Sequence, residues 1–302
     1  MMTAVIPVSD TRRRNFVFLV LFFGAIMVTG AAFLLYTFWV FGSVGDRTIA
    51  IGDAVAVVDI VGEIYYDRAK VDEIEDYIDD DRVKAVVVFI NSPGGGVAAS
   101  QALYHAVARV RQFKPVVASM ASVAASGGYY VACGADSIMA EEGTLTGSIG
   151  VIASFLNTEE LYHKIGLDVT VIKSGRWKDV GSPHREITPV EQEYLSTILD
   201  SSYQQFLEAV ADGRRIPLDE VRELAEGRLY TGAQALDAGL VDRLGSYRDA
   251  VDLAAAMGGI KGEPRVIRHR PRRSLLERIL GQSLSPVLEN RRERVSLKYI
   301  IP

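Results

Sequence analysis

Hydrophobic residues form one long uninterrupted run near the start of the chain and only short runs after it. Residues 16–41 contain no charged residue and consist mainly of Phe, Leu, Val, Ile and Ala. This exceeds the roughly 20 residues that span a bilayer, whereas a cleaved signal peptide has an apolar stretch of only about 7 to 15 residues. The run therefore predicts a transmembrane helix over residues 16–41.

Charge on either side of this run predicts its orientation. Arg12, Arg13 and Arg14 immediately precede it, while the far side begins with Gly42-Ser-Val-Gly-Asp46 and a single arginine, Arg47. The positive-inside rule then places residues 1–15 in the cytoplasm and the rest of the chain, after a linker over residues 42–49, outside.

In the rest of the chain, apolar residues follow the pattern of strands in some stretches and the spacing of helices in others. Short β-branched apolar runs predict buried strands over residues 55–60, 83–90, 115–120 and 167–172. Helical spacing predicts helices over residues 71–79, 101–113, 218–226, 232–238 and 247–257. A further long helix begins after Thr188, because Pro189 and Glu191 complete an N-terminal capping signal, and continues to about residue 212.

Alternating strands and helices predict a layered α/β domain over residues 50–260. Residues 261–302 form a basic tail, in which residues 274–284 have the pattern of a short amphipathic helix. Three interpretations of the tail stay open: a solvated segment, contact with anionic lipid headgroups, or contact with a neighbouring subunit.

Composition argues against some classes of function. The 302 residues are 49% hydrophobic, enough for a substantial core, and the net charge of −5 argues against nucleic-acid binding. Cys133 is the single cysteine and lies among apolar neighbours, so we expect a buried hydrophobe. Because metal-ligand spacings are absent from the sequence, we expect no metal.

Ser126 and Lys178 are the candidate nucleophile and base. Ser126 lies between a predicted strand and a helix of sequence Gly-Gly-Tyr-Tyr-Val-Ala, where backbone N–H groups favour an oxyanion, although serine is also a common helix cap. Ala124 stands where a G-x-S-x-G elbow requires glycine. A lysine amine acts as a base only when neutral, which requires its pKa to fall by about three units from 10.4. Lys173 is the nearest rival base.

Five landmarks in order resemble the signal peptide peptidase A family, membrane-anchored bacterial Ser-Lys proteases with a Clp/crotonase-like fold. They are Asn91-Ser-Pro-Gly-Gly-Gly96, Ala125-Ser-Gly-Gly-Tyr-Tyr130, Thr146-Gly-Ser-Ile-Gly150, Gly175-Arg-Trp-Lys-Asp179 and Tyr230-Thr-Gly-Ala-Gln-Ala-Leu-Asp-Ala-Gly-Leu-Val-Asp242. The resemblance covers residues 50–260 and implies a ββα spiral core with a helical C-terminal part, preceded by one transmembrane helix.

The resemblance also implies roles for individual residues. Ser126 is the nucleophile, Lys178 is the general base and Ser148 orients the lysine amine. The backbone N–H groups of Gly95 and Gly127 form the oxyanion hole. No cofactor is needed.

The resemblance further implies location and partners. The substrates are hydrophobic peptides, chiefly signal peptides left in the membrane after cleavage, and the protease domain faces the periplasm or cell exterior from the bacterial inner membrane. Copies of the chain assemble into a ring in which subunits complete one another's clefts, and we expect the ring-forming surface after Thr188.

Two alternatives from other classes stay open on the sequence. A crotonase-type acyl-CoA enzyme uses similar glycine-rich oxyanion loops, although the membrane anchor and the set of Ser126, Lys178 and Ser148 argue against it. A non-catalytic membrane scaffold, or pseudoprotease, retains site residues without turnover.

Overall fold

The computed structural model describes residues 10–44, 52–268 and 298–300. The chain divides into two compact units, one ending at Gly52 and the other beginning at Asp53. The expected amphipathic helix over residues 274–284 lies outside the described residues, as does most of the expected linker.

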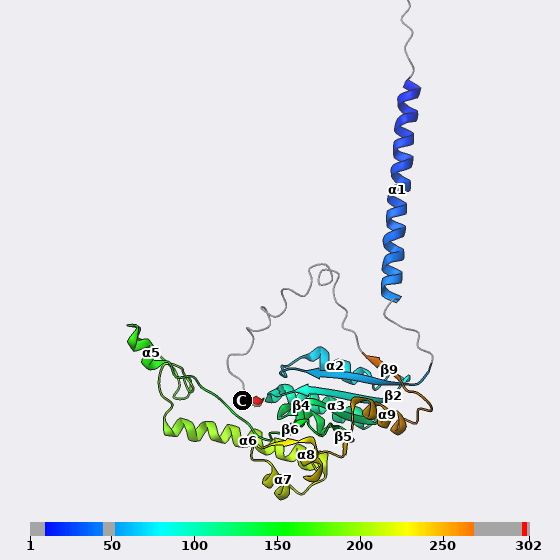
Figure 1. The fold of residues 1–302 in the computed structure, drawn as a ribbon. Coiled ribbons are helices and arrows are strands. Elements are labelled where there is room, and N and C mark those ends of the chain that lie inside the picture. Colours follow the sequence, from blue (N-terminus) through cyan, green and yellow to red (C-terminus); the bar gives the residue numbers. More distant parts are fainter. Residues whose placement is uncertain (1–9, 45–51, 269–297, 301–302) are drawn as a thin grey trace, which may run out of the picture. The chain divides into compact units, whose positions relative to one another are not determined.

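The first unit is the helix α1, Asp10–Val44 (Figure 1). Its apolar stretch Asn15–Thr37 has 23 residues and is long enough, by length and composition, to cross a membrane. At 1.5 Å per residue it spans about 34 Å, compared with a hydrocarbon core of about 30 Å. The Thr29 hydroxyl donates a hydrogen bond of 2.8 Å to the Ala25 carbonyl, so this polar side chain is satisfied within the helix. Helical structure extends to Val44, three residues beyond the predicted end, and includes the start of the expected linker.

The second unit is built on an eight-stranded sheet. The backbone path runs in the order β7-β6-β4-β2-β1-β9, and β5 and β8 extend it beside β4. All strand pairs in this sheet are parallel except β6 with β7. The strands are β1 (Ala54–Val61), β2 (Val83–Ser92), β4 (Val116–Ala125), β5 (Ser137–Ala140), β6 (Leu145–Gly147), β7 (Leu229–Thr231), β8 (Arg243–Leu244) and β9 (Arg265–Arg268).

Both faces of the central strands are buried. Because successive side chains point to opposite faces, Val55 and Val57 of β1 pack with the helix α9 (Tyr247–Met257), while Val58 belongs to the core on the other face. That larger core includes side chains from α2 (Arg68–Asp76), α3 (Val97–Arg111), α4 (Gly127–Ala132) and α6 (Pro189–Arg214). Each fully buried Val or Ile side chain contributes about 1.5–3 kcal/mol to the stability of the fold. Because both faces of the central strands are buried, their sequences are continuous apolar runs.

The helical signals in the sequence are confirmed. Thr188 and Glu191 form the expected capping box at the start of α6, and α9 has the predicted bounds. The helices α7 (Leu218–Leu224) and α8 (Gly232–Asp237) also form where their spacing predicts them, and α5 (Glu159–Lys164) precedes α6. Together with the parallel sheet, and with the ββα unit of β2, β3 (Gly94–Gly96) and α3, they confirm the predicted fold class.

One predicted strand is wrong. Residues 167–172 have no strand structure, and they are exposed. A β-branched run becomes a strand only beside a partner that accepts its backbone hydrogen bonds, and no named strand of the described residues pairs with this segment. Conversely, the short strands β5, β6, β7 and β8 have two to four residues each and too little pattern to be predicted.

Tyr129 ties the helix α4 to the loop that follows α8. Its side chain is fully buried, and its hydroxyl donates a 2.8 Å hydrogen bond to the carbonyl of Leu240. We predict that Tyr129→Phe lowers the free energy of unfolding by about 1–3 kcal/mol, because the Leu240 carbonyl stays buried without this donor. Denaturant unfolding of the full chain in detergent measures the change. The control Tyr66→Phe alters an exposed side chain, and equal stability of the two variants would contradict the prediction.

Candidate active site

Ser126 lies at a sharp turn between the end of β4 and the start of α4. Its backbone angles are φ 52° and ψ −117°, a conformation that side-chain-bearing residues rarely adopt and that costs on the order of 1–3 kcal/mol. Its side chain makes no capping hydrogen bond to α4, so the ordinary role of a serine at a helix start does not explain it. In α/β-hydrolases a strand-to-helix turn presents the nucleophilic serine, although the sequence here is not G-x-S-x-G.

Neighbouring backbone holds this turn in place. The Ser126 N–H donates a 2.7 Å hydrogen bond to the Gly147 carbonyl, and β4 pairs with β6 so that Ala125 lies opposite Gly147. On the other side, a Cβ added at Gly128 would lie 2.9 Å from the Ser92 carbonyl oxygen. The ends of β2, β4 and β6 therefore meet at one edge of the sheet, where parallel α/β sheets commonly bind ligands.

Ser148 lies beside Ser126 as the strand register requires. Its own backbone has φ 49°, its side chain is buried, and its N–H donates a 2.7 Å hydrogen bond to the Arg228 carbonyl. Among the described residues three non-glycine positions have positive φ, and Ser126 and Ser148 are two of them, with Arg215 the third. Strained backbone concentrated at one point is typical of functional sites.

The triglycine loop forms the short strand β3. Gly94 has φ +105°, and a Cβ added at Gly95 would lie 2.1 Å from the Ile64 carbonyl oxygen. Ile64 pairs with this strand, since its N–H donates to Gly94 at 2.8 Å and its carbonyl accepts from Gly96 at 2.9 Å. Only glycine at position 95 permits this approach. The sequence analysis missed Ile64, because an isolated apolar residue carries no signal for a backbone contact.

The helix α4 contacts β3, which brings Gly127 to the same place. Gly127 is the first residue of α4, where N–H groups have no acceptor within the helix. The structure therefore brings together Ser126, Gly127, Ser148 and the loop that contains Gly95. Donors that lie around a buried hydroxyl suit the stabilisation of an oxyanion.

Lys178 is not brought to this cluster within one chain. It lies on an exposed segment between α5 and α6, and α5 lies apart from the sheet (Figure 1). In the described part of the chain, the side-chain hydrogen bonds and ion pairs of residues 157–188 all have their partners within residues 157–191. The neighbouring Trp177 does not shield this part of the segment from water, because its side chain is 39% exposed and stacks on Tyr194.

An ionic network holds the Lys178 segment to the start of α6. Arg185 donates to Asp179 at 3.0 Å and to both carboxylate oxygens of Glu191, which also caps the helix. Lys173 pairs with the same Asp179. The hydrogen bond from Arg185, followed by that from Lys173, lowers the pKa of Asp179, and Arg185 lowers the pKa of Glu191 to about 2.

The two candidate lysines differ in their ion pairs. Lys173 pairs with Asp179, whereas within the described residues no ion pair of Lys178 is found.

Cys133 and the α4 residues Tyr129 and Tyr130 belong to the core. All three side chains are buried, which for Cys133 confirms the expectation from the sequence. Burial raises the pKa of the Cys133 thiol to about 12, so the thiol is a packing group and not a second nucleophile.

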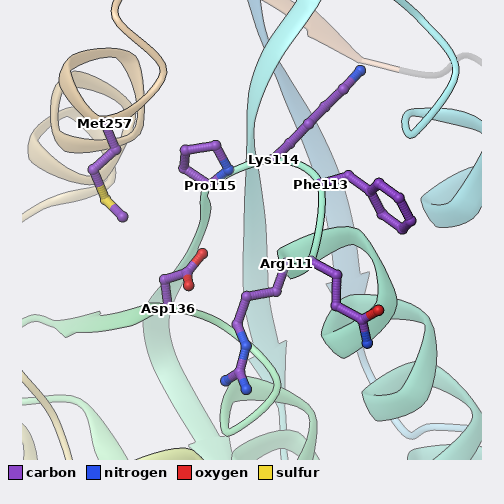
Figure 2. A pocket seen from close by; sticks show the side chains of 7 residues that line it. Arg111, Phe113, Lys114, Pro115, Asp136 and Met257 are labelled. Carbon is purple, nitrogen blue, oxygen red and sulfur yellow. The ribbon is translucent and has the colours of Figure 1, made fainter.

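A pocket at the opposite end of β4 has a different character. Figure 2 shows this cavity of about 250 Å³, lined by Arg111, Gln112, Phe113, Lys114, Pro115, Asp136 and Met257. Its polar groups are engaged in the fold, since Asp136 accepts from the Val116 N–H at 2.8 Å and Arg111 donates to the Ala135 carbonyl at 3.2 Å. The ten residues of β4 separate it from Ser126 by about 33 Å. It is therefore separate from the serine site.

Comparison with known proteins identifies the family. The sequence profile of peptidase family S49 matches residues 108–261. A Methanocaldococcus jannaschii protein named as a protease is 34% identical over 270 residues, which are 84% of this chain and 85% of that protein. The chain therefore belongs to peptidase family S49, a family of serine proteases. This assignment favours the protease hypothesis over an acyl-CoA enzyme.

Other relatives match over shorter stretches. A Synechocystis protein, also named as a protease, is 46% identical over 183 residues, which are 61% of this chain and 66% of that protein. The chloroplastic serine protease SPPA of Arabidopsis thaliana is 37% identical over 191 residues, or 63% of this chain and 28% of that protein. A solved membrane-bound stomatin-specific protease has a TM-score of 0.46 and 16% identity, covering 74% of this chain and 100% of the other.

Acid should loosen the Lys178 segment before the sheet unfolds. Carboxylates with lowered folded pKa values stabilise the folded segment at pH above their unfolded values near 4, and this stabilisation is lost as the pH falls through the folded values. For Glu191 the folded value is about 2. We predict that the fluorescence emission of Trp177, measured in a Trp39→Phe background, shifts to the red between pH about 4.5 and 2. The far-ultraviolet circular dichroism signal should stay unchanged over the same range.

The variant Asp179→Asn tests the cause of this transition. It should move the transition to higher pH, because Arg185 and Lys173 then lose their shared carboxylate. Asp168→Asn is the matched control, since Asp168 lies on the same segment, is 85% exposed and pairs only with His163 among the described residues. Identical transitions in the two variants would rule out the network as the origin.

Proposed function

We propose that the protein is a membrane-anchored serine endopeptidase that degrades hydrophobic peptides, with cleaved signal peptides as its substrates. The observation that carries the proposal is the strained, buried Ser126 at the start of α4, the helix that contacts the triglycine strand β3. Membership of peptidase family S49 supports the reaction class. The apolar stretch of α1 supports the anchor, and Arg12–Arg14 before it support an N-terminus in the cytoplasm and a protease domain outside.

The proposed reaction is acyl transfer in two steps. The neutral amine of Lys178 takes the proton of the Ser126 hydroxyl, whose oxygen attacks the peptide carbonyl and forms a C–O bond. The oxyanion accepts hydrogen bonds from the Gly95 and Gly127 N–H groups. The C–N bond then breaks, and the leaving amine takes the proton from the lysine. Water, deprotonated by the same lysine, next hydrolyses the ester and frees Ser126.

Lys178 reaches Ser126 from a second copy of the chain in this proposal. The side-chain hydrogen bonds and ion pairs of the segment that carries Lys178 lie within residues 157–191, and its surface is unusually apolar for a solvated loop. Its exposed apolar side chains include Leu156, Leu161, Ile165, Leu167, Val169, Val171 and Ile172, the last of which is 96% exposed. Apolar surfaces of this kind mark protein interfaces. A neighbouring copy that covered the segment would also remove water from the lysine amine, which favours its neutral form.

The first test compares turnover of an apolar fluorogenic peptide by the full chain, Ser126→Ala and Lys178→Ala between pH 6 and 10. We expect each variant to lose activity by at least about a thousandfold. The wild-type rate should rise with pH through a single apparent pKa well below about 10.4, because only the neutral lysine accepts a proton. Lys173→Ala is the control and should stay active. A folded Lys178→Ala variant with full activity would refute the assignment of the base.

The second test asks whether Lys178 of one copy acts on Ser126 of another copy. Ser126→Ala and Lys178→Ala chains are dissociated, mixed in equal amounts and reassembled. If each cleft takes its serine and its lysine from different chains, about a quarter of the clefts regain both groups. Mixing Ser126→Ala with the double variant Ser126→Ala/Lys178→Ala gives a matched inactive control. An inert first mixture that nevertheless forms mixed oligomers would place both residues in the same chain.

A further inference from the structure

One peptide group connects the two positive-φ serines of the site to the strand β7. It is the peptide between Gly147 and Ser148. Its carbonyl, on Gly147, accepts a 2.7 Å hydrogen bond from the Ser126 N–H, and its N–H, on Ser148, donates a 2.7 Å hydrogen bond to the Arg228 carbonyl. Because a peptide group is planar, its C=O and N–H turn together, and a rotation would break both hydrogen bonds. The position of Ser126 therefore depends on what keeps this peptide from turning.

Gly147 is the residue at which such a rotation is easiest. Its φ is +77°, and glycine adopts positive and negative φ about equally well. The sheet restrains it from both sides, since Ala125 lies opposite Gly147 on β4 and Leu229 lies opposite it on β7. However, β6 has three residues and ends at Gly147, so the strand stops where the critical peptide begins. A further contact has to hold the glycine.

The ring of Tyr230 provides this contact. A Cβ added at Gly147 would lie 2.6 Å from Cδ2 and 3.2 Å from Cε2 of Tyr230, so the ring lies directly against the glycine backbone. The far end of the ring is fixed as well, because the Tyr230 hydroxyl donates a 3.0 Å hydrogen bond to the Leu224 carbonyl at the end of α7. The side chain also packs against the larger core. A ring held in this way restricts the movement of Gly147.

We infer that Tyr230 is a positioning residue for the proposed reaction, which holds the Gly147–Ser148 peptide in place and, through it, the nucleophile Ser126. The inference rests on the proposed function of Ser126. Tyr230 acts through Gly147 and not on the reacting atoms. Without the ring, Gly147 can turn, and Ser126 then loses a hydrogen bond that holds its strained turn. Its hydroxyl leaves the orientation needed for attack, and a misplacement of about 1 Å costs on the order of a hundredfold in rate.

A second tyrosine provides a matched control. The Tyr203 hydroxyl, on α6, donates a hydrogen bond to the Ala225 carbonyl, one residue after the carbonyl that Tyr230 binds. The Tyr203 side chain is likewise partly buried against the larger core. The three atoms nearest to an added Cβ at Gly147, however, belong to Tyr230 and to the Arg228 carbonyl. Loss of the Tyr203 side chain therefore disturbs the same end of α7 and leaves the support of Gly147 intact.

The test compares the full chain, Tyr230→Ala and Tyr203→Ala in detergent on the same fluorogenic peptide, at a temperature at which all three are folded. Tyr230→Ala should lower kcat about a hundredfold and leave KM within about twofold, because the substrate still binds while the nucleophile is misplaced. Labelling of Ser126 by a serine-directed phosphonate should slow by a similar factor. Tyr203→Ala should keep kcat within about threefold. Tyr230→Phe, which retains the ring, should recover most of the lost kcat.

A double-mutant cycle tests whether the ring acts through Gly147. In the wild type, Gly147→Ala places a methyl group against the Tyr230 ring and 3.0 Å from the Arg228 carbonyl oxygen. In the Tyr230→Ala background the clash with the ring is gone. The factor by which Gly147→Ala lowers kcat/KM should therefore be at least about tenfold smaller in that background than in the wild type. Equal factors in the two backgrounds would show that ring and glycine act independently, which would overturn the inference.

Two failures can be told apart. If Tyr230→Ala keeps the wild-type kcat and labelling rate, or if folded Tyr203→Ala loses as much kcat as Tyr230→Ala, the positioning role is wrong and the proposed protease stands. If the folded wild type neither hydrolyses the peptide nor reacts with the phosphonate, the proposed function itself fails. Should Tyr230→Ala not fold, Tyr230→Leu, which leaves a smaller side chain at this position, takes its place under the same criteria.

Discussion

The turn at Ser126 is the constraint on which the arrangement of the site depends. A strand that is buried on both faces cannot end and start a helix within one residue unless that residue takes a strained conformation, here φ 52° and ψ −117°. Two contacts compensate for the strain: the hydrogen bond from Ser126 to the Gly147 carbonyl, and the close packing of Gly128 on the Ser92 carbonyl. Both contacts come from strands parallel to β4, so the sheet itself fixes where the serine points.

The same constraint explains why glycines lie around the serine. At positions 95, 128 and 147 an added Cβ would come within 3.0 Å of another residue's atoms. At positions 95 and 128 the glycine lets one backbone segment approach another, and at position 147 it makes room for the Tyr230 ring. The N–H groups of Gly95 and Gly127, the proposed oxyanion donors, therefore lie on segments whose positions the fold fixes. Donors fixed in this way need no rearrangement when charge develops, which is the property that makes an oxyanion hole effective. Rigid parallel strands and close backbone contacts thus supply this half of the proposed chemistry.

The sequence predicted what local pattern determines. The strands β1 and β2 and the helix α9 follow from their periods, and the capping residues Thr188 and Glu191 mark the start of α6. The proximity of Ser126 and Ser148 needed the motif order, because only the register of β4 and β6 makes them neighbours. The segment 167–172 has the composition of a strand but no partner strand among the described residues. The strand β10 (Lys298–Ile300) pairs with β3, but it is too short and too distant in sequence for this pairing to be predicted. Partner choice is a property of the folded molecule, and no local period encodes it.

The position of Lys178 extends this argument to the assembly. The serine half of the site is rigid and buried, whereas the lysine lies on an exposed segment that is braced by its own ion pairs through Asp179 and Arg185. A segment stabilised by its own ion pairs keeps its shape before a partner binds. Its exposed apolar side chains then make association favourable. A protease divided in this way cannot act as a single free chain, so in the proposed enzyme hydrolysis begins only after copies have gathered at the membrane. In that proposal, assembly supplies the base and the parallel sheet supplies the serine.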